Sequence, residues 1–120
     1  NNLISNITDI FMTNSLKMLN LKGNNIDNID VADWWQLSRL EYLDLSRNKL
    51  NSLPSMWHKS MPMLKYLNLE LNNFVSLENI QIHNFVDLRE VYLKNNNITY
   101  VDINQNILRL VPKRCTVYIV

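Results

Sequence analysis

An apolar pattern recurs every 24 residues along most of this 120-residue chain and leaves few alternatives for its fold. The first copy reads Leu-x-x-Leu-x-Leu-x-x-Asn-x-Ile-x-x-Ile from Leu16, and further copies start at Leu40, Leu64 and Leu88. A fixed period of about 20–50 residues is typical of a solenoid, in which each repeat buries its apolar side chains against its neighbours. The pattern therefore predicts stacked layers that present an extended surface for binding rather than an enclosed pocket for chemistry.

Each copy also contains a short stretch in which apolar and polar residues alternate, and this period of two predicts a strand. The inward-pointing pairs are Leu19/Leu21, Leu43/Leu45, Leu67/Leu69, Val91/Leu93 and, in a fifth strand, Cys115/Val117. We expect these strands to pair in parallel about 4.8 Å apart. The predicted fold class is α/β: a right-handed solenoid with a parallel sheet on its concave face and a mostly irregular or short-helical convex side.

The segments between the strands are expected to supply the rest of the core and its polar support. Trp34, Leu37, Ile82 and Phe85 are expected to fill the core from the convex side, whereas Trp57 lies one step off their register. One polar position is the same in all four copies, and a buried amide there both donates to and accepts from the backbone, which keeps stacked turns satisfied. This predicted asparagine ladder comprises Asn24, Asn48, Asn72 and Asn96.

The length and the repeat predict one domain over residues 1–120. Its predicted parts are a partial repeat at 1–15, full repeats at 16–39, 40–63, 64–87 and 88–111, and a partial repeat at 112–120. Neither end shows a polar cap, and uncapped solenoid layers associate readily. We therefore expect either that the repeats belong to a longer array or that a partner covers the ends, including a second copy through self-association.

The outward strand positions form columns across the predicted sheet. The first column is Met18, Tyr42, Tyr66, Glu90 and Arg114; the second is Asn20, Asp44, Asn68, Tyr92 and Thr116; the third is Lys22, Ser46, Glu70, Lys94 and Tyr118. Tyrosine and arginine are favoured at protein interfaces because they bury a large area and keep a polar tip. The predicted partner-binding residues are Tyr42, Asp44, Tyr66, Asn68, Glu70, Arg89, Glu90 and Tyr92. The alternative is that these residues only stabilise the sheet through cross-strand pairs.

Several other functions lack support in the sequence. The formal net charge of +1 gives no reason to expect nucleic-acid binding, and no apolar run reaches the roughly 20 residues of a membrane span. His58 and His83 are far apart and lack the spacing of metal ligands. No catalytic triad, phosphate-binding loop or HExxH motif is present. We therefore expect neither an enzyme nor a bound metal or cofactor.

Two features bear on the compartment in which the chain works. Asn6-Ile7-Thr8 and Asn97-Ile98-Thr99 match the N-glycosylation sequon, although chance matches are frequent in a chain this rich in asparagine. Cys115 occupies an inward position of the fifth strand, where it is either a small buried thiol or the partner of a cysteine outside this sequence. Used sequons would place the chain outside the cell, whereas silent sequons and a reduced Cys115 would fit the cytoplasm.

With these residues in place, the chain resembles the leucine-rich repeat family. The resemblance covers residues 16–101 in four strong copies, and the 24-residue length with the Leu53-Pro54 step is similar to the typical animal subclass. That subclass is common in Toll-like receptor ectodomains, Slit-like surface proteins and secreted immune proteins of mosquitoes. The resemblance implies extracellular recognition of a protein ligand or co-receptor, in innate immunity or adhesion, with a cytosolic scaffold or adaptor as the alternative. The cysteine-rich caps of such receptors are absent from this sequence, which leaves the receptor function resting on resemblance.

Overall fold

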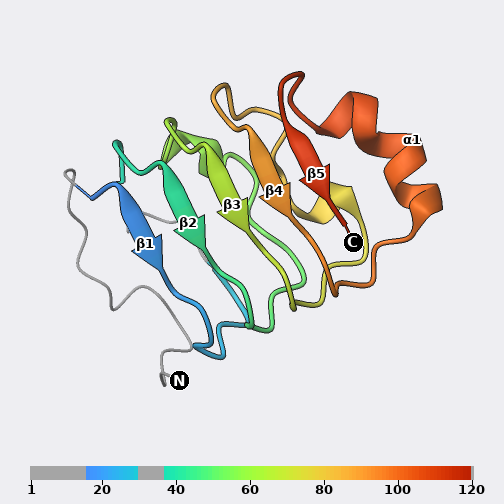
Figure 1. Cartoon of the computed structure of the whole chain (residues 1–120), viewed down its shortest axis with the longest axis horizontal. Helices are drawn as coiled ribbons and strands as arrows, with labels where there is room; N and C mark the ends of the chain where they lie inside the picture. The colour runs from blue at the N-terminus through green and yellow to red at the C-terminus, as the bar shows by residue number, and fades with distance from the viewer. Residues whose placement is uncertain (1–15, 30–36, 120) are drawn as a thin grey trace.

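The computed structural model describes residues 16–29 and 37–119, and these form a solenoid around one parallel sheet (Figure 1). Its strands are β1 (Met18–Asn20), β2 (Tyr42–Asp44), β3 (Tyr66–Asn68), β4 (Glu90–Tyr92) and β5 (Thr116–Tyr118). They lie side by side in chain order, and each adjacent pair is parallel. The predicted fold class, an α/β repeat solenoid with a parallel sheet on its concave face, is therefore confirmed.

The return segments contain short 3₁₀ helices in the middle of the molecule and one longer α-helix near its end. The 3₁₀ helices are η2 (Trp57–Lys59) and η3 (Leu77–Asn79), and the α-helix α1 (Tyr100–Leu110) has 11 residues. The convex side is thus more helical in its last return than the sequence pattern predicted.

Local sequence explains why α1 forms where it does. The Thr99 hydroxyl accepts a hydrogen bond from the backbone N–H of Asp102, which caps the first turn. Asp102 in the first turn and Arg109 in the last turn complement the helix dipole. Pro112 follows shortly after the end of the helix, as is common beyond helix C-termini. The spacing of Thr99, Asp102 and Pro112 is a helix signal that the repeat pattern obscured.

The helix shifts the register of the last strand. Met18 pairs with Tyr42, Tyr42 with Tyr66 and Tyr66 with Glu90, each 24 positions apart, but Glu90 pairs with Thr116, 26 positions later. The columns predicted for the fifth strand were therefore wrong by two residues: Thr116 replaces Arg114 in the first column, and Tyr118 replaces Thr116 in the second.

The shift also changes the position of Cys115. Val117 rather than Cys115 pairs with Val91, so Cys115 precedes β5 instead of filling its first inward position. The thiol is partly buried against the core. Burial, and to a smaller extent the nearby Glu90 carboxylate, raises the pKa of Cys115 to about 12. The thiol is therefore protonated at neutral pH.

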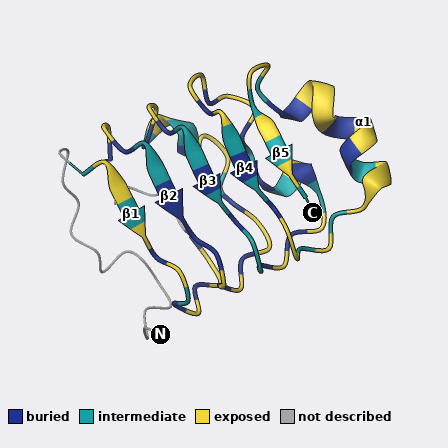
Figure 2. Ribbon diagram, viewed as in Figure 1, coloured by how far each residue is buried: buried dark blue, intermediate teal, exposed yellow. Residues whose placement is uncertain are grey.

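The core lies between the sheet and the return segments (Figure 2). Leu37, Ile82 and Phe85 are buried as predicted, whereas Trp34 lies outside the described residues. Trp57 is also buried, although its register gave no clear prediction. Its ring packs edge-on against Phe85 with 4.6 Å between centroids, and its indole N–H donates to the carbonyls of Ile80 and Gln81. One aromatic residue thus joins two adjacent layers through both packing and hydrogen bonds.

The asparagines at the repeated polar position link each layer to the one before it. The Asn72 side-chain oxygen accepts from Leu50 N–H, while its amide donates to the carbonyls of Leu45 and Leu69 at 3.0 and 3.1 Å. Asn48 and Asn96 repeat this arrangement one layer earlier and one layer later. The Asn24 oxygen is buried without a partner among the described residues, because the donors in this ladder come from the preceding layer.

A second polar network fastens α1 to the preceding return. One Asp102 oxygen accepts from the Ser76 hydroxyl at 2.8 Å and from the Asn106 amide, and the other accepts from Leu77 N–H at 2.9 Å. The exposed Arg109 guanidinium bonds both Asn106 and Glu78. Asp102 therefore caps α1's neighbour η3 as well as supporting α1 itself. Among the helices that the structure describes, none is long and apolar enough to cross a lipid bilayer.

Candidate functional site

The outward side of the five strands, called the concave face below, carries a cluster of four tyrosines. Tyr42 and Tyr66 are register partners, as predicted, and their rings lie 6.4 Å apart at 40°. Tyr92 and Tyr118 are also partners, and their rings stack with 4.9 Å between centroids and 10° between planes. The predicted columns separated Tyr92 from Tyr118, so the sequence missed this stacked pair. Tyr118 lies beside Tyr92 because β5 is displaced by two residues, which the 24-residue period did not predict.

A hydrogen bond within β4 fixes the orientation of Tyr92. The Tyr92 hydroxyl donates to a carboxylate oxygen of Glu90, two residues earlier on the same face. This hydrogen bond, together with partial burial and the charge of Glu90, raises the pKa of Tyr92 to about 12. The phenol therefore stays protonated and keeps Glu90 directed along the sheet surface.

The second outward column caps the ends of the strands, a structural role that the sequence pattern did not predict. The side-chain oxygens of Asn20, Asp44 and Asn68 each accept the backbone N–H two residues later, which caps the end of the strand. Asp44 also accepts from the Ser46 hydroxyl at 2.6 Å and is only 8% exposed. Asp44 thus supports a turn, a role that the sequence pattern did not predict. Asn68 remains partly exposed.

Acidic groups surround the first pair of tyrosines. The pKa of Tyr42 is raised, first by burial and then by the charges of Asp44 and Glu70. Glu70 is partly exposed, and its carboxylate forms no ion pair within the described ranges 16–29 and 37–119. Asp44 and Glu70 therefore place negative charge beside the Tyr42 ring.

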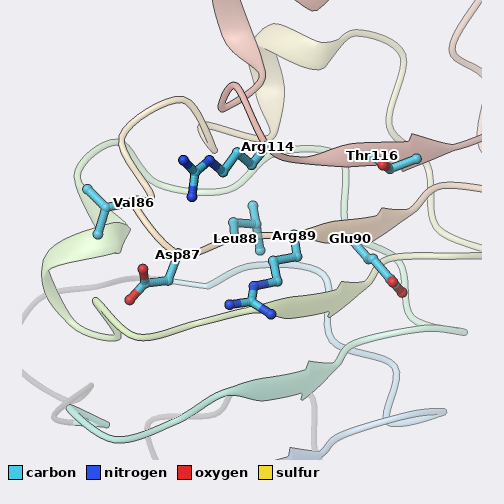
Figure 3. A pocket seen from close by; sticks show the side chains of 7 residues that line it. All are labelled: Val86, Asp87, Leu88, Arg89, Glu90, Arg114 and Thr116. Carbon is cyan, nitrogen blue, oxygen red and sulfur yellow. The ribbon is translucent and has the colours of Figure 1, made fainter.

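Basic side chains lie along the margin where the strands begin. Lys65 pairs with Glu41 at 3.4 Å. Arg89 and Arg114 lie on opposite sides of a groove of about 400 Å³, together with Val86, Asp87, Leu88, Glu90 and Thr116 (Figure 3). The Glu90 side chain is directed away from both arginines in Figure 3. The predicted site residue Arg89 thus belongs to this margin rather than to the tyrosine cluster.

The remaining predicted positions fall elsewhere in the fold. Asn97 is exposed in the loop before α1. Asn6 lies outside the described residues. His58 packs against Phe85, and its pKa is lowered by burial and by the nearby charges of Lys59 and His83. No group of three potential metal ligands occurs within residues 16–29 and 37–119.

Comparison with known proteins agrees with the repeat geometry. A family model described as "Leucine rich repeat" matches residues 1–50 and 38–98. The chain is 34% identical over 107 residues to a zebrafish (Danio rerio) protein named transforming growth factor beta activator LRRC33, and the match covers 85% of the chain. It is 35% identical over 75 residues to mouse (Mus musculus) podocan, covering 62% of the chain. The matches span only 16% and 11% of those two longer relatives.

Proposed function

Because the chain belongs to the leucine-rich repeat family, we propose that it is an extracellular recognition module that binds a protein on its concave face. Innate immunity and cell-surface adhesion are the proposed settings, and the partner is a protein ligand or a co-receptor. The observation that carries the proposal is the tyrosine cluster on the sheet, because tyrosines bury a large area at interfaces at a low entropic cost.

The arrangement of the cluster favours binding over a purely structural role. Tyr118 is 41% exposed although its ring stacks on Tyr92, so the pair presents aromatic surface to solvent. Cross-strand packing alone explains the Tyr42–Tyr66 contact, which is why the proposal rests on Tyr92 and Tyr118 as well. The zebrafish relative is named as an activator of a growth factor, an action exerted on another protein. That name supports a binding role for the repeats.

The face should be tested by affinity capture from secreted and cell-surface proteins. Wild-type protein is compared with Tyr66→Ala on the concave face and with Val75→Ala as the matched control. Val75 is 57% exposed in the loop after β3 and lies off the sheet. We expect a partner that wild type and Val75→Ala retain and that Tyr66→Ala loses. A partner retained equally by all three folded proteins would contradict the concave-face assignment.

The alternative is a cytosolic scaffold or adaptor that uses the same face. Intact-mass measurement before and after removal of N-glycans separates the two locations. A mass loss that maps to Asn97 or Asn6 would support passage through the secretory pathway. An unchanged mass, together with a partner found among cytosolic proteins, would favour the scaffold.

The described C-terminal end supports the further proposal that the repeats form part of a longer array. On α1, Ile107 and Leu108 are 36% and 97% exposed, and they line a groove with Val111, Pro112 and Cys115. Apolar side chains at the end of a solenoid are normally covered by another layer. Sedimentation of the 120-residue chain against a longer natural form checks this: self-association should be confined to the shorter chain.

A further inference from the structure

The chemistry of the proposed partner can be narrowed from the charges on the concave face. The two central outward positions of strands β2 to β5 carry no lysine or arginine. They hold tyrosines, Asp44 and Glu90, and Glu70 lies directly beyond Asn68 on the same side. The acid–aromatic strip is defined here as Tyr42, Tyr66, Glu70, Glu90, Tyr92 and Tyr118. Its charged residues are Glu70 and Glu90, and the basic residues around it are Lys65, Arg89 and Lys94, of which Lys94 lies on the layer next to Glu70.

The two glutamates of the strip, Glu70 and Glu90, form no ion pair with a basic side chain of the described residues. The ion pairs that the described residues form are Lys65–Glu41 and Arg109–Glu78, so neither Glu70 nor Glu90 is neutralised by a basic side chain of that part. Glu90 accepts one hydrogen bond, from the Tyr92 hydroxyl, and a carboxylate has acceptor capacity for several more. A cation that approached the strip would meet unpaired carboxylate oxygens.

The tyrosine rings add a second attraction for a cation. An aromatic face is negative, and a cation within about 6 Å of the ring centroid is attracted to it. The stacked rings of Tyr92 and Tyr118 stand next to Glu90, since both tyrosines belong to the column beside it. The pKa of Tyr42 is raised mainly by burial and that of Tyr92 mainly by its hydrogen bond to Glu90, and nearby carboxylates contribute less to both.

We propose that the acid–aromatic strip is a receptor for an arginine or lysine side chain of the partner protein. Arginine fits better than lysine, because its planar guanidinium stacks on a ring and bonds a carboxylate at the same time. Lys65 and Arg89 at the margin disfavour a uniformly basic partner and favour one whose basic residue stands among neutral or acidic neighbours. This inference rests on the proposed function and specifies the partner for it.

The first experiment follows by NMR the binding of short capped peptides to the isotope-labelled 120-residue chain. The probe is a glycine peptide that contains two arginines, and the matched control replaces each arginine with citrulline, which has nearly the same shape but no charge. We expect the arginine peptide to shift the ring signals of Tyr92 and Tyr118 and to bind about three- to tenfold more tightly than the citrulline peptide. Added salt should weaken the binding of the arginine peptide more than the binding of the citrulline peptide.

Equal binding of the two peptides, or shifts confined to residues outside the strip, would overturn the proposal. Because this comparison uses the unmodified protein, it does not depend on the folding of a variant.

The second experiment uses Glu90→Gln and Glu70→Gln, with Glu78→Gln as the control. Glu78 is exposed on η3, away from the sheet, and pairs with Arg109. The two strip variants should each lose most of the preference for arginine over citrulline, while Glu78→Gln should keep it. A captured partner that is lost by Tyr66→Ala but retained by Glu70→Gln and Glu90→Gln would leave the proposed function intact and contradict the cation site.

Discussion

The inner layers of the solenoid and its last layer use the same strand alternation but differ in packing and spacing. Leu43 and Leu67, on β2 and β3, are completely buried because a layer lies on each side of them. On the last layer, Ile103 and Leu110 of α1 are each 8% exposed, and Val117 of β5 is only partly buried. Figure 2 shows the same contrast between β3 and the exposed β5.

The difference teaches that the return segment, rather than the strand, sets the spacing of the repeats. An α-helix advances about 1.5 Å per residue, whereas an extended chain advances about 3.3 Å. A return that contains the 11-residue α1 therefore needs more residues to cross the same width, and the last strand pairs 26 rather than 24 positions on. Because the last strand is displaced by two residues, an even number, the residues that point inward still alternate as the 24-residue period predicted.

The largest expected effect comes from removing a leucine of an inner layer. Leu67→Ala should lower the free energy of unfolding by about 2–5 kcal/mol, since the layers on either side prevent the cavity from collapsing. Val117→Ala in the last layer should lower it by only about 1 kcal/mol, because that side chain already contacts solvent. Urea unfolding of both variants checks the comparison, and equal losses would show that the two layers are packed alike.

The asparagine ladder should show a smaller contrast, between the buried Asn72 and the partly exposed Asn96. Asn72→Ala leaves Leu50 N–H and the carbonyls of Leu45 and Leu69 without their partner and should cost about 2–4 kcal/mol. Asn96→Ala removes equivalent bonds from a partly exposed position, where water replaces them, and should cost about half as much. Thermal melts of the two variants measure the difference. A larger loss for Asn96→Ala would contradict the lower burial of Asn96.

The attachment of α1 can be tested through Asp102. Asp102→Ala removes its hydrogen bonds to Ser76, Leu77 and Asn106. The free energy of unfolding should fall by about 1–3 kcal/mol. Hydrogen exchange should then rise in η3 and α1 before it rises in β2 and β3. Asn104→Ala, on the exposed side of the same helix, is the control and should change little. Uniform acceleration across the whole sheet would show that α1 does not unfold as a separate unit.

The hydrogen bond within β4, the strand next to the last one, has a pH signature. Tyr92 ionises in the folded protein near pH 12, above its ordinary value of 10.0, because the protonated phenol donates to Glu90. The folded state therefore holds the proton more tightly, so this contribution to stability is present below pH 10 and is lost as the pH rises toward 12. Phenolate absorbance should include a component near pH 12, and that component should disappear in Tyr92→Phe. Loss of a normally titrating tyrosine instead would contradict the hydrogen bond.

Much of the fold could be predicted because its determinants are local and periodic. The positions of Leu43, Leu67 and Asn72 follow from a repeat that never drifts between residues 16 and 101. The last layer could not be placed by period alone, because the capping pair Thr99 and Asp102 and the proline at 112 change the length of the return. A helix search in the return segments, made separately from the repeat, would have found it.

The candidate site was predictable in part. The Tyr42–Tyr66 pair followed from the period and was confirmed, whereas the Tyr92–Tyr118 stack depended on the shifted register. The turn-capping role of Asp44 was missed because outward alternation was taken to mean exposure, while the hydroxyl and N–H of Ser46 cover the carboxylate. A short acidic side chain two residues before serine is a signal for such a turn.

The most direct test of the concave face as the binding surface is tyrosine footprinting of the complex with the captured partner. Four tyrosines lie on that face, and Tyr100, which is 66% exposed on α1, serves as an internal control. The reactivity of each toward a phenol-modifying reagent is measured with and without the partner by mass spectrometry. The account predicts that the partner protects Tyr66 and Tyr118 and leaves Tyr100 reactive. Protection of Tyr100 with unchanged reactivity at Tyr66 and Tyr118 would contradict it.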